Sequence, residues 1–500
     1  MGNPLAFAMI AVWPLVCLVL FDRLPAARAL LWSIIGGYLL LPSVTAIPAP
    51  LFPDLDKVTG SAVGALLGML FISRDGRPKW PEGKLARLLI ALYIAVPLLS
   101  ALANGAPMPI GPLSLPGISL YDGISSLLAA AIALLPMILA GSLPDAGDGP
   151  LRLMRALALA GLVYSFPMLL EIRLSPQLNV WIYGFFAHDF IQMIRYGGFR
   201  PMVFLTHGLW VALFAFTAVA SSAAIARVQG YARRPLVMTA YLMAVLVLCK
   251  SAASILYGVA LVPLILFASP RIQLRCAALI AAAVLSYPLL QWTELLPTEN
   301  IIASVAEMDL DRSRSLEFRF NNERLLLEHA AESPWVGWSG WGRNMVFDPV
   351  TGEDISVADG AWIIILGVSG MLGFVAQFGL LVLPIFLGWR NARLQDNAPF
   401  ASLALIHAAT LIDLIPNATL TPLSWLTTGV LLAAVERPAE VRASDPGPLA
   451  AVRAKGQRPA PADSALPPEP VWRIGRPDPG HAGRWLLGGD QPRSRFSSRR

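Results

Sequence analysis

Long apolar stretches recur along the chain, and polar residues gather between them. Residues 5–21, 85–103 and 202–226 are three clear examples. Each approaches the ~20 apolar residues that cross a ~30 Å hydrocarbon core as a helix. A helix is required because no water is available inside lipid to satisfy the backbone polar groups. The pattern therefore predicts an all-α fold, a polytopic bundle of transmembrane helices.

The apolar segments predict thirteen spans, within a range of about 12–14. One stretch, 235–268, needs a choice, because as a single helix it would be about 51 Å long. Lys250 lies near its centre, where a charge in mid-bilayer would be costly. We therefore expect two short helices that turn at Lys250, and one long, tilted helix is the alternative. The predicted spans are residues 5–21, 29–47, 58–73, 85–103, 124–143, 151–172, 201–226, 235–249, 252–268, 272–292, 359–388, 398–415 and 418–435.

The composition agrees with a membrane protein and limits the classes of partner. Of the 500 residues, 56% are hydrophobic and only 14% are charged, whereas soluble domains carry roughly 25% charged residues. The formal net charge of +6 raises the question of nucleic-acid binding. Most basic residues flank the predicted spans, however, and membrane topology accounts for them there. We therefore expect no nucleic-acid partner.

The short loops differ in charge between the two sides of the predicted membrane. Lys and Arg are frequent in 74–87 and 227–234, whereas 104–122 contains neither. Short cytoplasmic loops gather positive charge, so the basic side is predicted to be cytoplasmic. Two long loops, 173–200 and 293–358, then lie outside the cytoplasm.

The C-terminal residues 436–500 follow the predicted membrane domain, 1–435, on the cytoplasmic side. They are rich in Pro, Gly, Ala and Arg and contain few large apolar residues. Such a composition cannot bury a core of its own. We expect a disordered cytoplasmic tail.

The longer outer loop contains a polar segment, 313–332, of good helix formers without Gly or Pro. Arg319 and Glu323 are four residues apart, as are Arg324 and Glu328, which favours an exposed helix. Arg319 and Arg324 lie about 140° apart around that helix, so a ligand that touches both must reach around it. The alternative is an interfacial helix whose charges are solvated.

Tryptophan and glycine follow this segment in the sequence Pro-Trp-Val-Gly-Trp-Ser-Gly-Trp-Gly at 334–342. Trp338 and Trp341 suit either the head-group depth of a bilayer, where tryptophan is enriched, or a sugar-binding surface. Asp359 then opens a span whose glycines at 367, 370 and 373 let neighbouring helices approach closely. At the mouth of the bundle Asp359 can stay hydrated or act as a base.

The shorter outer loop carries Arg195 and Arg200. The planar fork of arginine donates two hydrogen bonds at once to a phosphate. Together with Arg319 and Arg324 on the same side of the membrane, these residues predict a site for an anionic substrate presented from the membrane. A pyrophosphate-linked lipid fits that description.

Four ionisable residues are predicted at membrane depth: His207, His407 and Asp413 inside spans, and Lys250 at the turn between two of them. Ionisable side chains at membrane depth are functional candidates by default. The alternative is that they pair with polar groups on neighbouring helices.

Taken together, these features resemble the O-antigen ligase and O-antigen polymerase superfamily, the Wzy-like proteins of bacterial polysaccharide assembly. Members have about a dozen spans and one large periplasmic loop late in the chain. That loop carries an Arg-bearing helix, a Pro-x-x-Gly-x-Gly-like turn and a polar residue before a Gly-rich span. Residues 319–331, 334–340 and Asp359 are similar to these three parts, and Arg195-Tyr-Gly-Gly-Phe199 is similar to an earlier family element. Lys250-Ser-Ala-Ala-Ser254 resembles a Ser-rich turn of the family.

The resemblance implies a glycosyltransferase of the bacterial inner membrane. Its donor would be an undecaprenyl-diphosphate-linked oligosaccharide, and its acceptor the hydroxyl of another glycan, in exopolysaccharide or O-antigen assembly. Other polysaccharide assembly proteins and membrane lipid are the further partners implied.

The same resemblance implies roles for the candidate site residues. Arg195, Arg200, Arg319 and Arg324 would stabilise the leaving pyrophosphate, with His207, Trp338 and Trp341 as glycan-binding or supporting residues. Asp359 would be the base, with Glu323 second. The outer loops contain no evident acidic metal-binding motif, so we expect a metal-independent mechanism without a cofactor.

Three alternatives remain open. Ligases of the family usually carry a His where this chain has Asp359, which favours a repeat-unit polymerase over a ligase that transfers glycan to a lipid A-core or other acceptor. A transporter or flippase of lipid-linked sugars predicts functional charges deep within the spans and internal repeat symmetry. A scaffold protein leaves the outer arginines without a role.

Overall fold

The computed structural model describes residues 2–49, 52–74, 77–143, 146–307 and 309–437. The predicted tail, 436–500, lies outside the described residues except for its first two positions.

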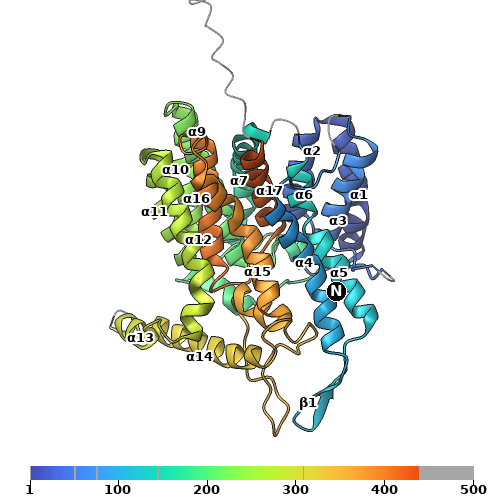
Figure 1. Ribbon diagram of the computed structural model, residues 1–500. Helices are drawn as coiled ribbons and strands as arrows, with labels where there is room; N and C mark the ends of the chain where they lie inside the picture. Colours follow the sequence, from blue (N-terminus) through green and yellow to red (C-terminus); the bar gives the residue numbers. More distant parts are fainter. Residues whose placement is uncertain (1, 50–51, 75–76, 144–145, 308, 438–500) are drawn as a thin grey trace, which may run out of the picture. The chain divides into compact units, whose positions relative to one another are not determined.

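Each of the thirteen segments predicted to span the membrane contains helix, so the predicted all-α class is confirmed (Figure 1). The helices are α1 (Pro4–Arg23), α2 (Ala26–Leu40), α3 (Lys57–Phe71), α4 (Lys84–Ala103), α5 (Leu120–Ala133), α6 (Leu135–Gly141), α7 (Gly149–Leu174), α8 (Leu178–Tyr183), α9 (Gly208–Val228), α10 (Arg233–Leu248), α11 (Ala252–Phe267), α12 (Pro270–Trp292), α13 (Thr298–Ala306), α14 (Leu310–Glu332), α15 (Ala361–Arg390), α16 (Ala398–Asp413) and α17 (Pro422–Glu436).

Helix length and hydropathy identify a multi-pass membrane protein. Within the described part of the chain, seven helical segments are long and apolar enough to cross a bilayer, and the fold is a helical membrane bundle. The number of spans stays a prediction, because several of the other apolar helices have only 15 or 16 residues. The seven segments are α1, α4, α5 with α6, α7, α9, α12 and α15.

The predicted division of residues 235–268 is confirmed, and the single long helix is wrong. α10 and α11 are separated by a tight turn in which Lys250 has a positive φ of 55°. Each has 16 residues, five fewer than the 21 of α9, against which both pack. The difference is about 7 Å at 1.5 Å per residue. The Lys250 turn is therefore recessed into the bundle.

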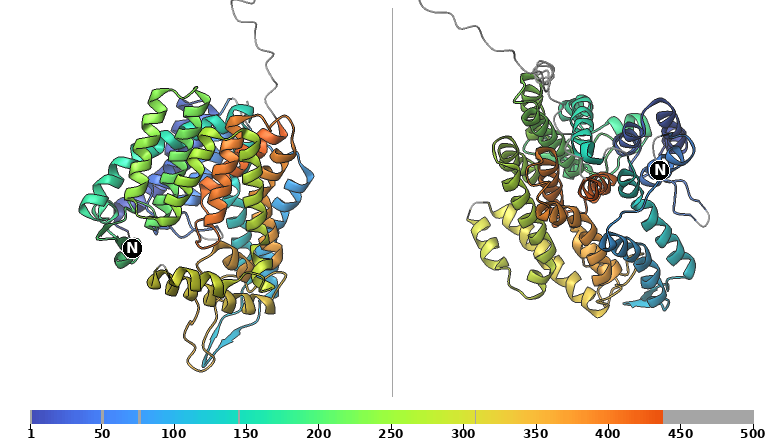
Figure 2. Two further views of the ribbon diagram at one scale, coloured as in Figure 1. Left: turned by 90° about the vertical axis from the view of Figure 1, so that its left-hand side faces the viewer. Right: turned by 45° about the horizontal axis from the view of Figure 1, so that its top comes forward.

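α13 and α14 lie across the ends of the bundle helices instead of running along them (Figures 1 and 2). This confirms the helix predicted at 313–332. We call this end of the bundle the α14 end. Trp292 and Ala361 lie there, because α12 leads into α13 and α15 follows the loop after α14. The antiparallel order of α9 to α12 also directs the start of α9 and the Lys250 turn towards the α14 end.

Two short antiparallel hairpins complete the fold. One pairs β1 (Met108–Ile110) with β2 (Leu113–Leu115), and the other pairs β3 (Ile194–Arg195) with β4 (Gly198–Phe199). The patterns of these loops gave no indication of strands, because each strand has only two or three residues.

α15 is broken at Gly370, whose φ of 63° and ψ of −165° are not helical. The turn 334–339 fills the break. Backbone hydrogen bonds run from Trp338 N to Gly367 O and from Ser339 N to Val368 O at 2.7 and 2.9 Å. Met371 N and Leu372 N donate in return to the carbonyls of residues 334 and 335. Gly370 therefore admits a loop into α15, whereas the sequence had indicated close approach of neighbouring helices.

Candidate functional site

Arg195, Arg200 and Lys250 meet where the β3–β4 hairpin packs beneath the α10–α11 turn, and we call them the cation cluster. The guanidinium of Arg200 donates two hydrogen bonds to the Lys250 carbonyl, from Nε at 3.2 Å and from Nη2 at 2.9 Å. Lys250 Nζ donates in return to the carbonyl of Arg195 at 3.0 Å. The short helices α10 and α11 make this possible, because their recessed turn leaves room for the hairpin. The side chain of Arg195 is exposed beside them.

The cation cluster forms no ion pair with a carboxylate of the described residues. Burial, and after it the charge of Arg195, lowers the pKa of Arg200 from its usual value. Two cations held by carbonyl groups, with a third exposed beside them, are an arrangement that attracts an anion.

His207 lies beside the cation cluster as the N-cap of α9, outside the helix, which corrects its predicted place inside a span. Its Nδ1 accepts a hydrogen bond from Leu209 N at 3.0 Å, and its ring packs edge-on against His188 at 4.7 Å. Burial, followed by the charges of His188, Arg200 and Arg195, lowers the pKa of His207 to about 4. His207 is therefore neutral at physiological pH and adds a hydrogen-bonding ring without adding charge.

A second group, the Arg319 cluster, joins Arg319 and Glu323 of α14 to Asp359. Arg319 Nε lies 3.7 Å from Asp359 Oδ2, and its Nη1 donates to the Pro416 carbonyl at 3.2 Å. Arg319 also acts electrostatically on Glu323, one helical turn away. It acts in the same way on Asp413, at the end of α16. The Arg319 guanidinium thus lies among three carboxyl groups, whereas the ion pairs of the described residues include no member of the cation cluster.

Glu323 is held by α12. Its Oε2 accepts hydrogen bonds from Tyr287 Oη and Gln291 Nε2, both at 2.9 Å. Burial raises the pKa of Glu323 above its ordinary value, and the hydrogen bonds and the Arg319 charge only partly oppose this. A carboxyl with a raised pKa is suited to proton transfer near neutral pH.

Glu323→Gln is expected to stabilise the protein at neutral pH. Because the folded-state pKa of Glu323 is raised, the folded state binds more protons than the unfolded state between the two pKa values. Stability therefore falls as pH rises through that window. Glutamine keeps an acceptor for Tyr287 and cannot ionise. Thermal unfolding from about pH 4 to pH 8 should show a smaller loss of stability in the variant. Glu328→Gln, at an exposed position of the same helix, is the control, and identical pH profiles for wild type and Glu323→Gln would contradict the assignment.

The remaining predicted site residues are placed separately. Arg324 is outside the Arg319 cluster and lines an open cavity beside α14, which Glu323 also lines. Trp338 stacks on His329 with ring centroids 4.7 Å apart, and its Nε1 donates to the His329 carbonyl at 2.8 Å. Trp338 therefore fixes the turn that enters α15. Trp341 is 73% exposed and available to a ligand or a membrane surface.

His407 and Asp413 are buried and bonded within the bundle. His407 Nε2 lies 3.0 Å from the Leu381 carbonyl, and Thr419 Oγ1 donates to Asp413 at 2.8 Å. The contact of His407 with α15 agrees with the alternative that it pairs with a polar group on a neighbouring helix, whereas Asp413 is bonded by the loop that follows its own helix.

Glu171 of α7 is a buried residue that the sequence patterns did not single out. Its carboxylate accepts hydrogen bonds from the backbone N–H groups of Leu178, Met202 and Val203 at 2.7–2.9 Å. Lys57 Nζ donates to the Phe204 carbonyl at 3.2 Å on the same segment. These two buried charges anchor the loop that carries the cation cluster. One feature of the sequence does indicate Glu171: it is a carboxylate near the end of an apolar span, where a charge needs a partner.

The described residues include no group of three or more His, Cys, Asp or Glu side chains arranged to hold a metal ion. The structure brings Arg195 together with Arg200, and Arg319 together with Glu323 and Asp359.

Comparison of the sequence with protein-family models and with curated proteins finds no match.

Proposed function

We propose that this protein is a membrane glycosyltransferase that joins undecaprenyl-diphosphate-linked glycan units to a glycan acceptor, as a polymerase of exopolysaccharide or O-antigen assembly. The observation that supports it best is the cation cluster at the α14 end. An anion presented from a membrane requires such a site, and a lipid pyrophosphate is such an anion. The charge pattern of the loops favours a bacterial inner-membrane protein whose α14 end faces the periplasm.

In the proposed reaction, an acceptor hydroxyl attacks the anomeric carbon of the donor glycan. The hydroxyl proton passes to Asp359, a new glycosidic bond forms, and the bond between the anomeric carbon and the pyrophosphate oxygen breaks. Undecaprenyl diphosphate leaves with the bonding electron pair. Arg195, Arg200 and Lys250 stabilise the charge that develops on it, which is usually the largest catalytic effect.

Arg319 has a different task in this scheme from the one implied by the family resemblance. Its guanidinium already contacts Asp359 and the Pro416 carbonyl. It therefore orients the base, while the cation cluster binds the pyrophosphate. Glu323, with its raised pKa, is the second candidate for receiving the proton.

The proposal is tested by reconstituting the purified chain in liposomes with a lipid-linked oligosaccharide. We expect release of free undecaprenyl diphosphate together with products that grow by whole repeat units. Transfer of a single glycan to a lipid A-core acceptor would show a ligase. Movement of the intact lipid-linked sugar across the bilayer without released diphosphate would overturn transfer in favour of transport.

A further inference from the structure

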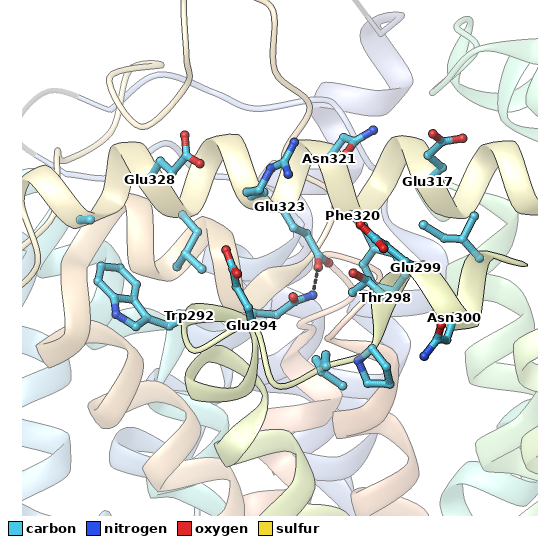
Figure 3. Close-up of a pocket in the computed structure, with 17 residues that line it drawn as sticks. Trp292, Glu294, Thr298, Glu299, Asn300, Glu317, Phe320, Asn321, Glu323 and Glu328 are labelled. Atoms are coloured by element: carbon cyan, nitrogen blue, oxygen red, sulfur yellow. Dashed lines mark hydrogen bonds between the residues drawn. The ribbon is translucent and has the colours of Figure 1, made fainter.

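An open cavity of about 790 Å³ lies between α14, α13 and the end of α12 (Figure 3). Its walls are the last residues of α12, the segment that follows, α13, and one face of α14. This volume falls within the ~300–1,000 Å³ range of small-molecule sites. The cavity is large enough for a short oligosaccharide.

The lining is polar and acidic, with aromatic rings included. The residues that line it include five carboxylates, three side-chain amides and a single guanidinium, that of Arg324. Trp292 is 56% exposed at the rim. The lining residues with chemical character are the carboxylates Glu294, Glu299, Glu317, Glu323 and Glu328, the amides Gln291, Asn300 and Asn321, and the aromatic residues Trp292 and Phe320.

These walls restrict the chemistry of the ligand. A phosphate or uronate would meet five carboxylates and one cation, and like charges at this range repel. An acyl chain would leave the carboxylates and amides without partners. A glycan hydroxyl, in contrast, both donates and accepts hydrogen bonds, and the exposed Trp292 ring provides a flat apolar surface for a sugar ring.

Glu323 links the cavity to the Arg319 cluster. Glu323 belongs to both, because it lines the cavity and lies one turn from Arg319, which contacts Asp359. Figure 3 shows Glu323 reaching from α14 towards the end of α12, between Glu294 and Thr298. A sugar bound in the cavity therefore lies beside Glu323, the second candidate for the base.

We infer that this cavity binds the acceptor glycan and selects segments without acidic groups. The role of this cavity as the acceptor site rests on the proposed function, whereas the binding of a glycan there does not. The acidic cavity and the cation cluster would thus sort the two substrates by charge: the anionic donor binds at one and the uncharged acceptor at the other.

The test is direct binding, measured on the full chain in nanodiscs. Saturation-transfer NMR and tryptophan fluorescence would be recorded with a panel of neutral oligosaccharides and matched uronate-containing ones, each about three to five sugars long. We expect neutral members to bind, and uronate-containing members to bind at least about tenfold more weakly. Preferential binding of the acidic members, or binding by no member of the panel, would overturn the inference.

Two sets of variants locate the site. Trp292→Ala should weaken neutral binding at least about tenfold, whereas Trp389→Ala, 41% exposed at the other end of α15, should leave it unchanged. Combined Glu294→Gln, Glu299→Gln and Glu328→Gln substitutions should bring the affinity for acidic oligosaccharides close to that for neutral ones. Unchanged binding in Trp292→Ala and in the triple variant would overturn the assignment to this cavity.

The binding assay and the transfer assay test the two proposals independently of each other. Glycan binding that depends on Trp292, without release of undecaprenyl diphosphate in liposomes, would overturn the proposed function and leave the cavity as a glycan site. Release of diphosphate with no binding that depends on Trp292 would overturn the cavity assignment alone.

Discussion

Replacement of Arg195 by alanine is expected to lower glycan transfer by a factor of about 10²–10³, the usual effect of removing one group that stabilises transition-state charge. The exposed guanidinium of Arg195 belongs to a cluster of three cations that no described carboxylate balances. Its loss leaves the fold intact, because Lys250 bonds to the backbone carbonyl of residue 195 and not to its side chain. The measurement is the initial rate of undecaprenyl diphosphate release from liposomes.

Arg390→Ala is the matched control for this prediction. Arg390 is also exposed, and it ends α15 at the face opposite the α14 end. We expect normal transfer in that variant and partial recovery in Arg195→Lys, which restores charge without the planar fork. A normal rate and normal polymer length in Arg195→Ala would remove the pyrophosphate role from the cation cluster.

Gly370→Ala is expected to destabilise the protein by about 3 kcal/mol or more. A Cβ atom at Gly370 would lie only 2.3–2.5 Å from the backbone of Trp335 and Val336, and the positive φ of 63° is strained for any other residue. The turn 334–339 would have to move out of the break in α15. The backbone N–H and carbonyl groups that join the turn to α15 would then lose their hydrogen bonds. Thermal unfolding of the purified protein, followed by circular dichroism, measures the loss.

Gly340→Ala, at the residue directly after the turn, provides the comparison. No atom lies within 4 Å of the position that its Cβ would take, so its unfolding midpoint should stay close to that of the wild type. Equal midpoints for Gly370→Ala and Gly340→Ala would mean that the turn does not depend on the break in α15.

Hydropathy and local spacing are sufficient to predict the apolar helices, the helix at 313–332 and one part of the candidate site. Each span predicted from an apolar run contains a helix in the structure. The cost of a charge in mid-bilayer predicted the turn at Lys250. The pairing of Arg319 with Glu323, and the separation of Arg324 from Arg319, followed from helical periodicity alone. These features are local, so a single sequence contains the information.

Contacts between distant segments were not predictable in this way. The anchoring of residues 202–203 by Glu171 joins positions about thirty apart, and neither segment has a spacing that indicates the other. The same applies to the cavity, which exists only because α13 and α14 fold back across the end of α12. His207 was placed inside a span because it borders an apolar run, whereas its side chain caps the start of α9.

The loop inserted in α15 also limits how this protein can be recombined with others. Four backbone hydrogen bonds join residues 334–339 to 367–372, and Asn104, the C-cap residue of α4, donates to the Gly337 carbonyl at 2.9 Å. A chimera that exchanges the long loop but keeps its own α15 would leave an interrupted helix with a foreign insert. Residues 334–372 must therefore be exchanged as one block, and natural variation in the loop is constrained by the helix that it completes.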